Sequence, residues 1–292
     1  MPIIVTGRNG QVGSALCDIL SDKAIGLSRN EVDLSDPESL YEKLEKYNPS
    51  AIINAAAYTA VDKAEEEKDL AFKINAHSPA IMAKFCKDKD IPFITYSTDY
   101  VYSGEGNKPH NENSPKTPLN IYGKSKLEGE NLVREVGGKY IILRVSWIYD
   151  SVHQNFVKTM LRLGKEREDL RIVNDQIGAP TYAPSLAKAS IDILNSDRFY
   201  PGIYNLCPQG ETSWYDYALE IFTLAKDNDI ELKVKNIEPV ASSEFPTPAK
   251  RPLNSRLDCS LIKEKLNIEL PHWKNDLKEC MEKIGRNKNE SS

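Results

Sequence analysis

Features that mark secreted, zinc-binding and membrane proteins are scarce in this sequence. Its 292 residues include only five cysteines, an odd number with no CxxC pair among them. Neither a disulfide framework nor a zinc cluster is therefore indicated. No apolar run approaches the roughly 18 residues of a membrane-spanning helix, and residues 1–13 reach a glycine-rich turn before any signal-peptide apolar region forms. We expect a cytoplasmic protein that does not enter a membrane.

An excess of positive charge is also missing. The chain carries 38 lysines and arginines against 43 aspartates and glutamates, a formal charge of −5. Nucleic acids and anionic membranes require concentrated positive charge, so we expect neither as a partner. The 40% of hydrophobic and 28% of charged residues are ordinary for a globular protein. The length allows one large core or a main domain with a smaller companion.

Short apolar runs alternate with segments of helical periodicity in the first half of the chain. The runs are residues 3–6, 51–57, 92–97 and 140–145, and the helical segments are residues 11–20, 37–47, 69–88 and 122–136. The runs lack in/out alternation, which is typical of strands buried on both faces of a parallel sheet. This order predicts an α/β fold with a doubly wound parallel sheet of the Rossmann type.

After about residue 150, prolines break the chain into shorter pieces, which predicts a second, smaller lobe. Residues 1–150, together with segments at about 183–208 that return to the first sheet, form the predicted NAD(P)-binding domain. The remainder of residues 151–285 forms the predicted substrate-binding lobe. Residues 286–292 are polar and are predicted to be a disordered tail.

A glycine-rich turn follows the first predicted strand and opens the first helix. It contains Gly7, Gly10 and Gly13 in the spacing GxxGxxG. In this context the first glycine allows a tight turn, the second lets backbone N–H groups approach a pyrophosphate, and the third lets helix and strand pack closely. The turn therefore predicts a dinucleotide site. A plain glycine-containing turn between strand and helix is the alternative.

The end of the second predicted strand bears on which dinucleotide is used. An acid at this point binds the 2′-hydroxyl of NAD, whereas a cation accommodates the 2′-phosphate of NADP. Here residues 24–27 are followed by Ser28 and Arg29, so the acid is missing and a guanidinium lies beside its place. We favour NADPH. NADH, dual specificity and a merely exposed arginine stay open.

Tyr122 and Lys126 lie four residues apart at the start of a predicted helix, so both project from one face. A phenol has a pKa of about 10, and a nearby ammonium lowers it toward the range of a proton shuttle. Lys126 could also hold the nicotinamide ribose. Thr98 ends the preceding predicted strand and can donate to a substrate carbonyl in the crevice of the sheet. An ordinary surface tyrosine and lysine are the alternative.

These motifs together are similar to those of a known enzyme family. The GxxGxxG spacing is typical of extended short-chain dehydrogenase/reductases. With it come the segments 54–65, 97–102, 122–126, 174–181 and 251–257. The chain closely resembles the dTDP-4-dehydrorhamnose reductase family, and the resemblance spans nearly its whole length.

The resemblance implies reduction of the C4 ketone of dTDP-4-dehydro-β-L-rhamnose to dTDP-L-rhamnose. Tyr122 would donate the proton, assisted by Lys126 and Thr98. The implied cofactor contacts are Gly10, Gln11, Val12, Asp33, Leu34, Ala57, Tyr58, Thr59 and Tyr96. Ser28 occupies the position at which the family has the acidic residue that binds the cofactor. The implied substrate, a nucleotide-diphosphate deoxysugar, would contact Thr98, Asp99 and Trp147, and either Arg251 or Arg256 could bind its diphosphate.

Some members of the family dimerise through magnesium held by glutamates. Ser14 replaces one of those glutamates here, so we assign no metal site, and a monomer or a homodimer stays open. Two other functions remain as alternatives: a non-catalytic regulatory subunit of the methionine adenosyltransferase type, and a related nucleotide-sugar epimerase or dehydratase. Retention of Thr98, Tyr122 and Lys126 favours the reductase over the former. The choice between dTDP and UDP sugars also stays open.

Overall fold

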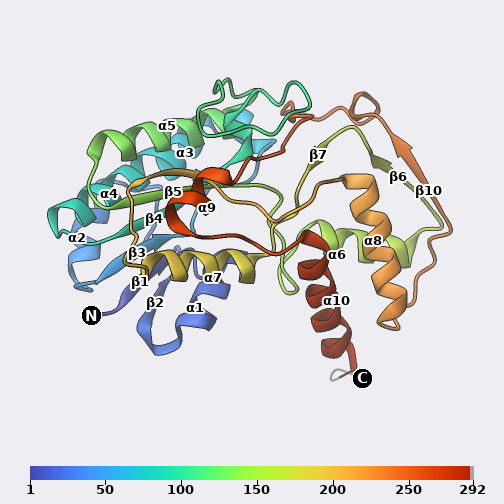
Figure 1. Cartoon of the computed structure of the whole chain (residues 1–292), viewed down its shortest axis with the longest axis horizontal. Coiled ribbons are helices and arrows are strands. Elements are labelled where there is room, and N and C mark those ends of the chain that lie inside the picture. The colour runs from blue at the N-terminus through green and yellow to red at the C-terminus, as the bar shows by residue number, and fades with distance from the viewer. Residues whose placement is uncertain (290–292) are drawn as a thin grey trace.

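The computed structural model describes residues 1–289, with the side chains of residues 1–286. A six-stranded parallel sheet forms its larger part (Figure 1), with the strands in the order β2-β1-β3-β4-β5-β8. The strands are β1 (Ile3–Thr6), β2 (Ala24–Leu27), β3 (Ala51–Asn54), β4 (Phe93–Thr98), β5 (Tyr140–Val145) and β8 (Gly202–Asn205). The predicted doubly wound parallel sheet is confirmed.

Helices cover both faces of this sheet (Figure 1). On one face, α1 (Gln11–Leu20) packs against α7 (Ala183–Leu194). On the other lie α2 (Leu40–Glu45), α4 (Ser78–Asp88) and α5 (Ile121–Val136). The segment predicted as one helix over 69–88 is α3 (Lys68–Phe72), a π-helical turn (Lys73–His77) and α4. The π turn inserts one wider loop of backbone into an otherwise helical segment.

The smaller part of the molecule has its own hydrophobic core. It contains α6 (Phe156–Glu166), α8 (Trp214–Asp227) and α10 (Trp273–Asn289), with β6 (Asp169–Val173) paired to β10 (Asn236–Val240) and β7 (Ile177–Gly178) paired to β9 (Thr212–Ser213). The helix α9 (Ser260–Leu266) packs beside β8. Short 3-10 turns lie at Ser21–Lys23, Lys63–Glu65, Asp99–Val101 and Ser242–Glu244.

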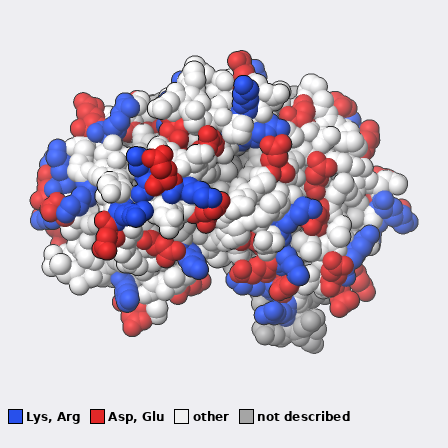
Figure 2. All heavy atoms as spheres, viewed as in Figure 1, with Lys and Arg blue, Asp and Glu red and all other residues white. Residues whose placement is uncertain are grey.

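The chain crosses between the two parts more than once. The helix α7 and strand β8 return to the first sheet, where β8 pairs with β5. On the face shown in Figure 2, acidic and basic side chains are interspersed over both parts. Within residues 1–289, no helix combines the length and apolar character needed to cross a bilayer.

The C-terminal boundary and the third strand differ from the predictions. The helix α10 continues to Asn289, so residues 286–289 are helical rather than part of a disordered tail, and residues 290–292 lie outside the described residues. The run predicted as a strand to Ala57 ends at Asn54. The Asn54 side chain bonds to Thr6 and Thr95 on both neighbouring strands, and the chain beyond it leaves the sheet.

Candidate active site

The predicted site residues gather at the carboxyl ends of the parallel strands. The glycine-rich turn follows β1, Ala57 follows β3, and Asp99 follows β4 directly. Trp147 lies just beyond the end of β5. In open α/β sheets this edge holds the ligand crevice, so the topology alone brings residues from four strands together.

The glycine-rich turn is shaped by close backbone contacts. Gly7 has a φ of +74°, and a Cβ on it would lie 2.7 Å from the backbone nitrogen of Ala56. A Cβ on Gly13 would lie 2.0 Å from the Gly7 carbonyl oxygen. Gly10 precedes α1 without any side-chain cap. The first N–H groups of α1 thus face a turn without bulky side chains at its glycines. We call the turn from Gly7 to Gly13 the glycine cradle, and its shape fits a pyrophosphate.

Gln11 links this cradle to the segment that follows β5. Its side-chain amide donates to the Ile148 carbonyl at 3.3 Å, and its Oε1 accepts from Asn155 Nδ2 at 3.0 Å. Asn155 also caps α6, accepting from the Lys158 N–H at 3.2 Å. The first turn of α1 is therefore tied to the smaller part of the molecule.

The end of β2 contains an acid that sequence reasoning missed. Glu31 turns back so that its Oε2 accepts from the Ser28 N–H at 2.6 Å and from the Ser28 hydroxyl. Arg29 is 73% exposed, and its Nε lies 3.5 Å from Asp33 Oδ1. Arg8 Nη1 lies 3.9 Å from Glu31 Oε1. The strand end thus holds both a carboxylate and guanidinium groups.

Thr98 and Tyr122 lie next to each other, and Lys126 lies one turn farther along α5. Asn120 caps α5 by accepting from the Gly123 N–H at 2.8 Å, and a Cβ on Gly123 would lie 2.3 Å from the Tyr100 carbonyl oxygen. Glycine at this position therefore lets the first turn of α5 approach the end of β4. The Thr98 hydroxyl donates to Asp99 Oδ1 at 3.0 Å and lies close enough to the Tyr122 phenol to affect the pKa of that phenol.

The pKa of the tyrosine differs from the prediction. Burial raises the pKa of Tyr122 to about 12, and the neighbouring Thr98 hydroxyl offsets only part of that rise. The Lys126 Nζ instead donates to the Tyr96 carbonyl oxygen at 2.6 Å. Burial lowers the pKa of Lys126 to about 8, although Glu130 opposes that shift. The predicted lowering of the tyrosine pKa by Lys126 is therefore wrong in this structure.

Asp99 is a buried acid beside this group. Only 3% of the residue is exposed, and its Oδ1 accepts from the Thr98 hydroxyl at 3.0 Å. Its Oδ2 has no hydrogen-bond partner among the described residues. Burial raises the pKa of Asp99 to about 6, with Ser255 and Thr98 lowering it in part. An unpartnered buried oxygen at a ligand edge is suited to accept a bond from a ligand hydroxyl.

Two supporting groups escaped the sequence analysis. Asn75, in the π-helical turn, accepts from the Tyr58 N–H at 2.8 Å and donates to the Tyr58 carbonyl at 3.0 Å, which fixes the segment after β3. Glu130 forms a buried pair with Arg144, whose Nε donates at 2.8 Å. No sequence motif marks either residue, because each contacts a partner that is distant in the sequence.

Trp147 has a strained backbone and an aromatic partner. Its φ is +48°, unusual for a bulky residue. Its ring stacks on Trp214 with centroids 3.7 Å apart, and Trp214 Nε1 donates to Gln176 Oε1 at 3.1 Å. A Cβ on Gly178 would lie 2.9 Å from the Trp147 ring. The indole is therefore held between two elements of the smaller part.

Both candidate arginines for a diphosphate already have carboxylate partners. Arg251 donates to Asp62 at 2.8 Å and 3.2 Å. Arg256 donates to Glu211 at 2.6 Å and 3.3 Å. Arg256 and Glu211 also border a cavity of about 450 Å³. Either arginine would have to exchange a carboxylate for a phosphate oxygen.

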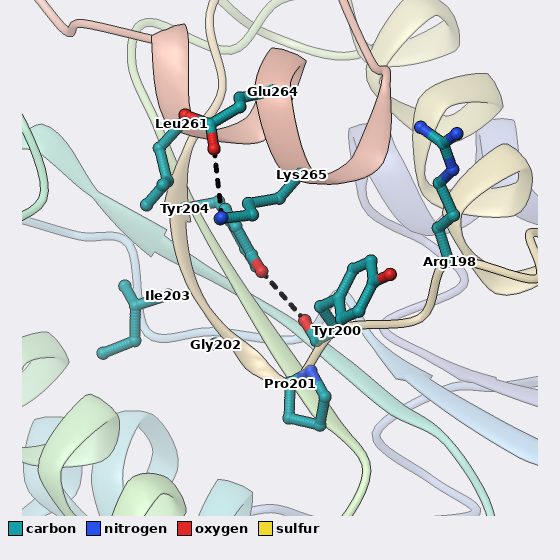
Figure 3. A pocket seen from close by; sticks show the side chains of 9 residues that line it. All are labelled: Arg198, Tyr200, Pro201, Gly202, Ile203, Tyr204, Leu261, Glu264 and Lys265. Carbon is teal, nitrogen blue, oxygen red and sulfur yellow. Dashed lines mark hydrogen bonds and ion pairs between the residues drawn. The ribbon is translucent and has the colours of Figure 1, made fainter.

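A second hollow, of about 680 Å³, lies away from these residues (Figure 3). It is lined by the start of β8 and by α9, and it includes Tyr200, Tyr204 and Lys265. The Tyr204 hydroxyl donates to the Tyr200 carbonyl at 2.9 Å. None of the residues that line it was predicted to bind cofactor or substrate, so this hollow is separate from the candidate site.

The chain is similar to known proteins over nearly its whole length. Residues 1–286 match the family model described as the RmlD substrate binding domain. A dTDP-4-dehydrorhamnose reductase of Burkholderia thailandensis is 41% identical over 285 residues, which cover 94% of this chain and 96% of the relative. A dTDP-4-dehydrorhamnose reductase of Escherichia coli is 40% identical and covers 97% of this chain and 98% of the relative.

Solved structures are similar over the same length. A dTDP-4-dehydrorhamnose reductase from Clostridium acetobutylicum has a TM-score of 0.90 at 38% identity, covering 97% of this chain and 99% of that one. The enzyme from Bacillus anthracis, in complex with NADP, has a TM-score of 0.88 at 35% identity, covering 96% and 99%. Similarity of sequence and fold over almost the whole length places the protein in one family. This chain belongs to the dTDP-4-dehydrorhamnose reductase (RmlD) family.

Proposed function

We propose that this chain reduces the C4 ketone of dTDP-4-dehydro-β-L-rhamnose to give dTDP-L-rhamnose, a step of nucleotide-sugar biosynthesis. Relatives that are about two-fifths identical over nearly the full length carry this activity in their names. The observation that carries the proposal is the assembly of Thr98, Tyr122 and Lys126 at the carboxyl end of β4, beside the glycine cradle.

A ketone becomes an alcohol by gaining a hydride at carbon and a proton at oxygen. The nicotinamide cofactor supplies the hydride. Tyr122 supplies the proton from its hydroxyl, because a pKa of about 12 keeps that phenol protonated at neutral pH. Thr98 would orient the ketone oxygen by donating to it in place of Asp99 Oδ1, which accepts the Thr98 hydroxyl in this structure. Lys126, one turn along α5 from Tyr122, would hold the nicotinamide ribose with its ammonium.

The cofactor in this proposal is NADPH, with NADH as the second possibility. The cradle of Gly7, Gly10 and Gly13 would hold the pyrophosphate against the first turn of α1, flanked by Gln11 and Val12. The remaining cofactor residues proposed from the resemblance are Ser28, Arg29, Asp33, Leu34, Ala57, Tyr58, Thr59, Tyr96, Tyr122 and Lys126. The six-stranded part is then the cofactor-binding domain.

The sugar nucleotide would bind between the two parts of the molecule. Asp99 Oδ2 is free to accept from a sugar hydroxyl, and the part of the Trp147 side chain that stays exposed would contact the deoxysugar. The diphosphate would be met by Arg251 or Arg256, after release from Asp62 or Glu211. The smaller part is then the substrate-binding lobe.

Tyr122→Phe tests the proposal by removing only the hydroxyl. We expect turnover of the 4-keto sugar nucleotide to fall by about 10²–10⁴-fold, the usual value of a positioned proton donor, while cofactor binding is retained. Tyr140→Phe is the matched control, because Tyr140 begins β5 at the opposite edge of the sheet. Nicotinamide absorbance reports turnover, and a calorimetric titration reports binding.

The outcomes separate the candidate functions. Turnover that depends on the 4-keto sugar and on Tyr122 supports the reductase. Cofactor binding without any turnover would point to the non-catalytic regulatory subunit instead. Equal turnover by the parent and the Tyr122→Phe variant would refute the assignment of the proton donor.

A further inference from the structure

An acidic side chain, Glu31, and a basic side chain, Arg8, lie close together at the end of β2. Dinucleotide-binding folds discriminate between NADH and NADPH at this position. We propose that Glu31 and Arg8 act as alternative readers of the adenosine ribose: Glu31 accepts from a 2′-hydroxyl, and Arg8 binds a 2′-phosphate. This inference rests on the proposed function, because it assumes that the glycine cradle holds a dinucleotide.

Glu31 takes the place of the acid that is missing at Ser28. A tight turn brings it back, with the N–H groups of Glu31 and Val32 donating to the Ser28 carbonyl at 3.2 Å and 3.0 Å. Val32 is buried and anchors the turn. The Glu31 carboxylate then accepts from both the N–H and the hydroxyl of Ser28. A carboxylate therefore lies at the end of β2, although it comes from three positions farther along the chain.

Arg8 reaches the same point from the glycine-rich turn. Its backbone N–H donates to the Leu27 carbonyl at 3.3 Å. Its side chain crosses β2 at Gly26, where an added Cβ would lie 3.1 Å from Arg8 Cβ. Arg8 Nη1 donates to the Gly26 carbonyl at 3.4 Å and lies 3.9 Å from Glu31 Oε1. A glycine inside the strand thus gives the arginine room to place its guanidinium beside Glu31.

NADH and NADPH would interact differently with Glu31 and Arg8. A ribose 2′-hydroxyl can donate to a carboxylate that stays on Ser28. A 2′-phosphate brings negative charge and only acceptor oxygens, so it repels Glu31 and competes with it for the Ser28 donors and for Arg8. Binding of NADPH therefore requires Glu31 to leave, which releases Arg8 for the phosphate.

The other charged groups at this end of the sheet are already paired with each other. Arg29 is the cation favoured from the sequence, but its Nε faces Asp33 at 3.5 Å. Asp33 in turn accepts from the Ser35 N–H at 2.9 Å. The cation that approaches the Glu31 carboxylate is Arg8, so Arg8 rather than Arg29 would be released to bind a 2′-phosphate.

The test measures binding of two fragments that lack the nicotinamide, 2′,5′-ADP and 5′-ADP, to the purified full chain by calorimetry. Glu31→Gln keeps the size of the side chain and removes its charge. We expect it to bind 2′,5′-ADP about tenfold more tightly relative to 5′-ADP, the effect of one lost charged contact. Arg8→Gln should shift the ratio by about as much in the opposite direction.

Glu135→Gln is the control for the loss of one negative charge. Glu135 is exposed near the end of α5, and a helix that follows a parallel strand ends at the opposite edge of the sheet. This variant should leave the ratio unchanged. Thermal unfolding of each variant, with Glu31→Ala as a second substitution at the same position, checks that a change in ratio is not a loss of folding.

Three results would overturn the inference. The ratio could stay at the parent value in both Glu31 variants, it could shift equally in Glu135→Gln, or Arg29→Gln could lower 2′,5′-ADP affinity while Arg8→Gln does not. In each case the parent still binds the fragments, and the proposed function stands. Binding of neither fragment by the folded parent would instead contradict the cofactor site and with it the proposed function.

Discussion

Asp99→Asn should make the protein more stable at neutral pH. Asp99 is 3% exposed, and its Oδ2 has no hydrogen-bond partner among the described residues. Burial raises the pKa of this carboxyl from 3.8 to about 6 in the folded state. The folded protein therefore disfavours the ionised form, and asparagine, which keeps the shape without the charge, removes that cost.

The size and sign of the effect follow from proton linkage. Each unit of pKa difference is worth about 1.4 kcal/mol, so a rise of about two units costs roughly 3 kcal/mol once Asp99 is ionised in both states. Between pH 3.8 and about 6 the folded state binds more protons than the unfolded state. The free energy of unfolding of the parent therefore falls as pH rises through this window, and the cost is complete above it.

Urea unfolding of the parent and the variant at two pH values measures this. The advantage of Asp99→Asn should be small at about pH 4.5 and should approach about 3 kcal/mol at about pH 7.5. Asp197→Asn, a change of an exposed carboxylate in a loop, is the matched control. An advantage that does not grow with pH, or a variant less stable than the parent at neutral pH, would refute the reasoning.

Two further predictions concern the residues around Lys126. Glu130→Gln leaves the Arg144 guanidinium, which is 1% exposed, without its counter-ion. We therefore expect the free energy of unfolding to fall by about 3–5 kcal/mol. A loss below about 1 kcal/mol in urea unfolding would contradict this prediction. Turnover should fall as pH rises through about 8, where Lys126 loses its proton. Because Glu130 raises that pKa, the midpoint of kcat/KM against pH should move lower in Glu130→Gln, and a parent profile flat across this range would contradict the role of the lysine.

Local patterns were enough to predict the sheet and the cradle. A continuous run of apolar residues indicates a strand buried on both faces of a parallel sheet, whichever strands it pairs with. Gly7 and Gly13 mark the turn in the sequence, because a side chain at either position would collide with backbone. The return of the chain to the first sheet was also predicted, within the segments at about 183–208 that contain α7 and β8. Such features depend on neighbours close in sequence or on burial alone.

Contacts between distant positions were not predictable in this way. Ser28 places no acid at the end of β2, but nothing in the spacing shows that the Glu31 carboxylate turns back onto Ser28 or that the Arg8 side chain reaches the Gly26 carbonyl. The four-residue spacing of Tyr122 and Lys126 placed both on one face of α5, yet it could not show that the Tyr96 carbonyl holds the ammonium. Spacing fixes the direction of a side chain, whereas its partner is set by the fold.

Several groups that are energetically unfavourable in the folded state lie at one edge of the sheet. Asp99 keeps a buried oxygen without a partner, Trp147 has a left-handed backbone, and Lys126 is a cation in a buried position. Each disfavours the folded state, and each lies where strands β4 and β5 end. Strain and unsatisfied polar groups persist where a ligand relieves them. A sugar hydroxyl would give the Asp99 oxygen the partner that it lacks, and a cofactor ribose would give the Lys126 ammonium a further acceptor, so two of these energetic costs lie on groups that the proposed reaction uses. The strained backbone of Trp147 is held by the packing of its ring against Trp214 and Gly178.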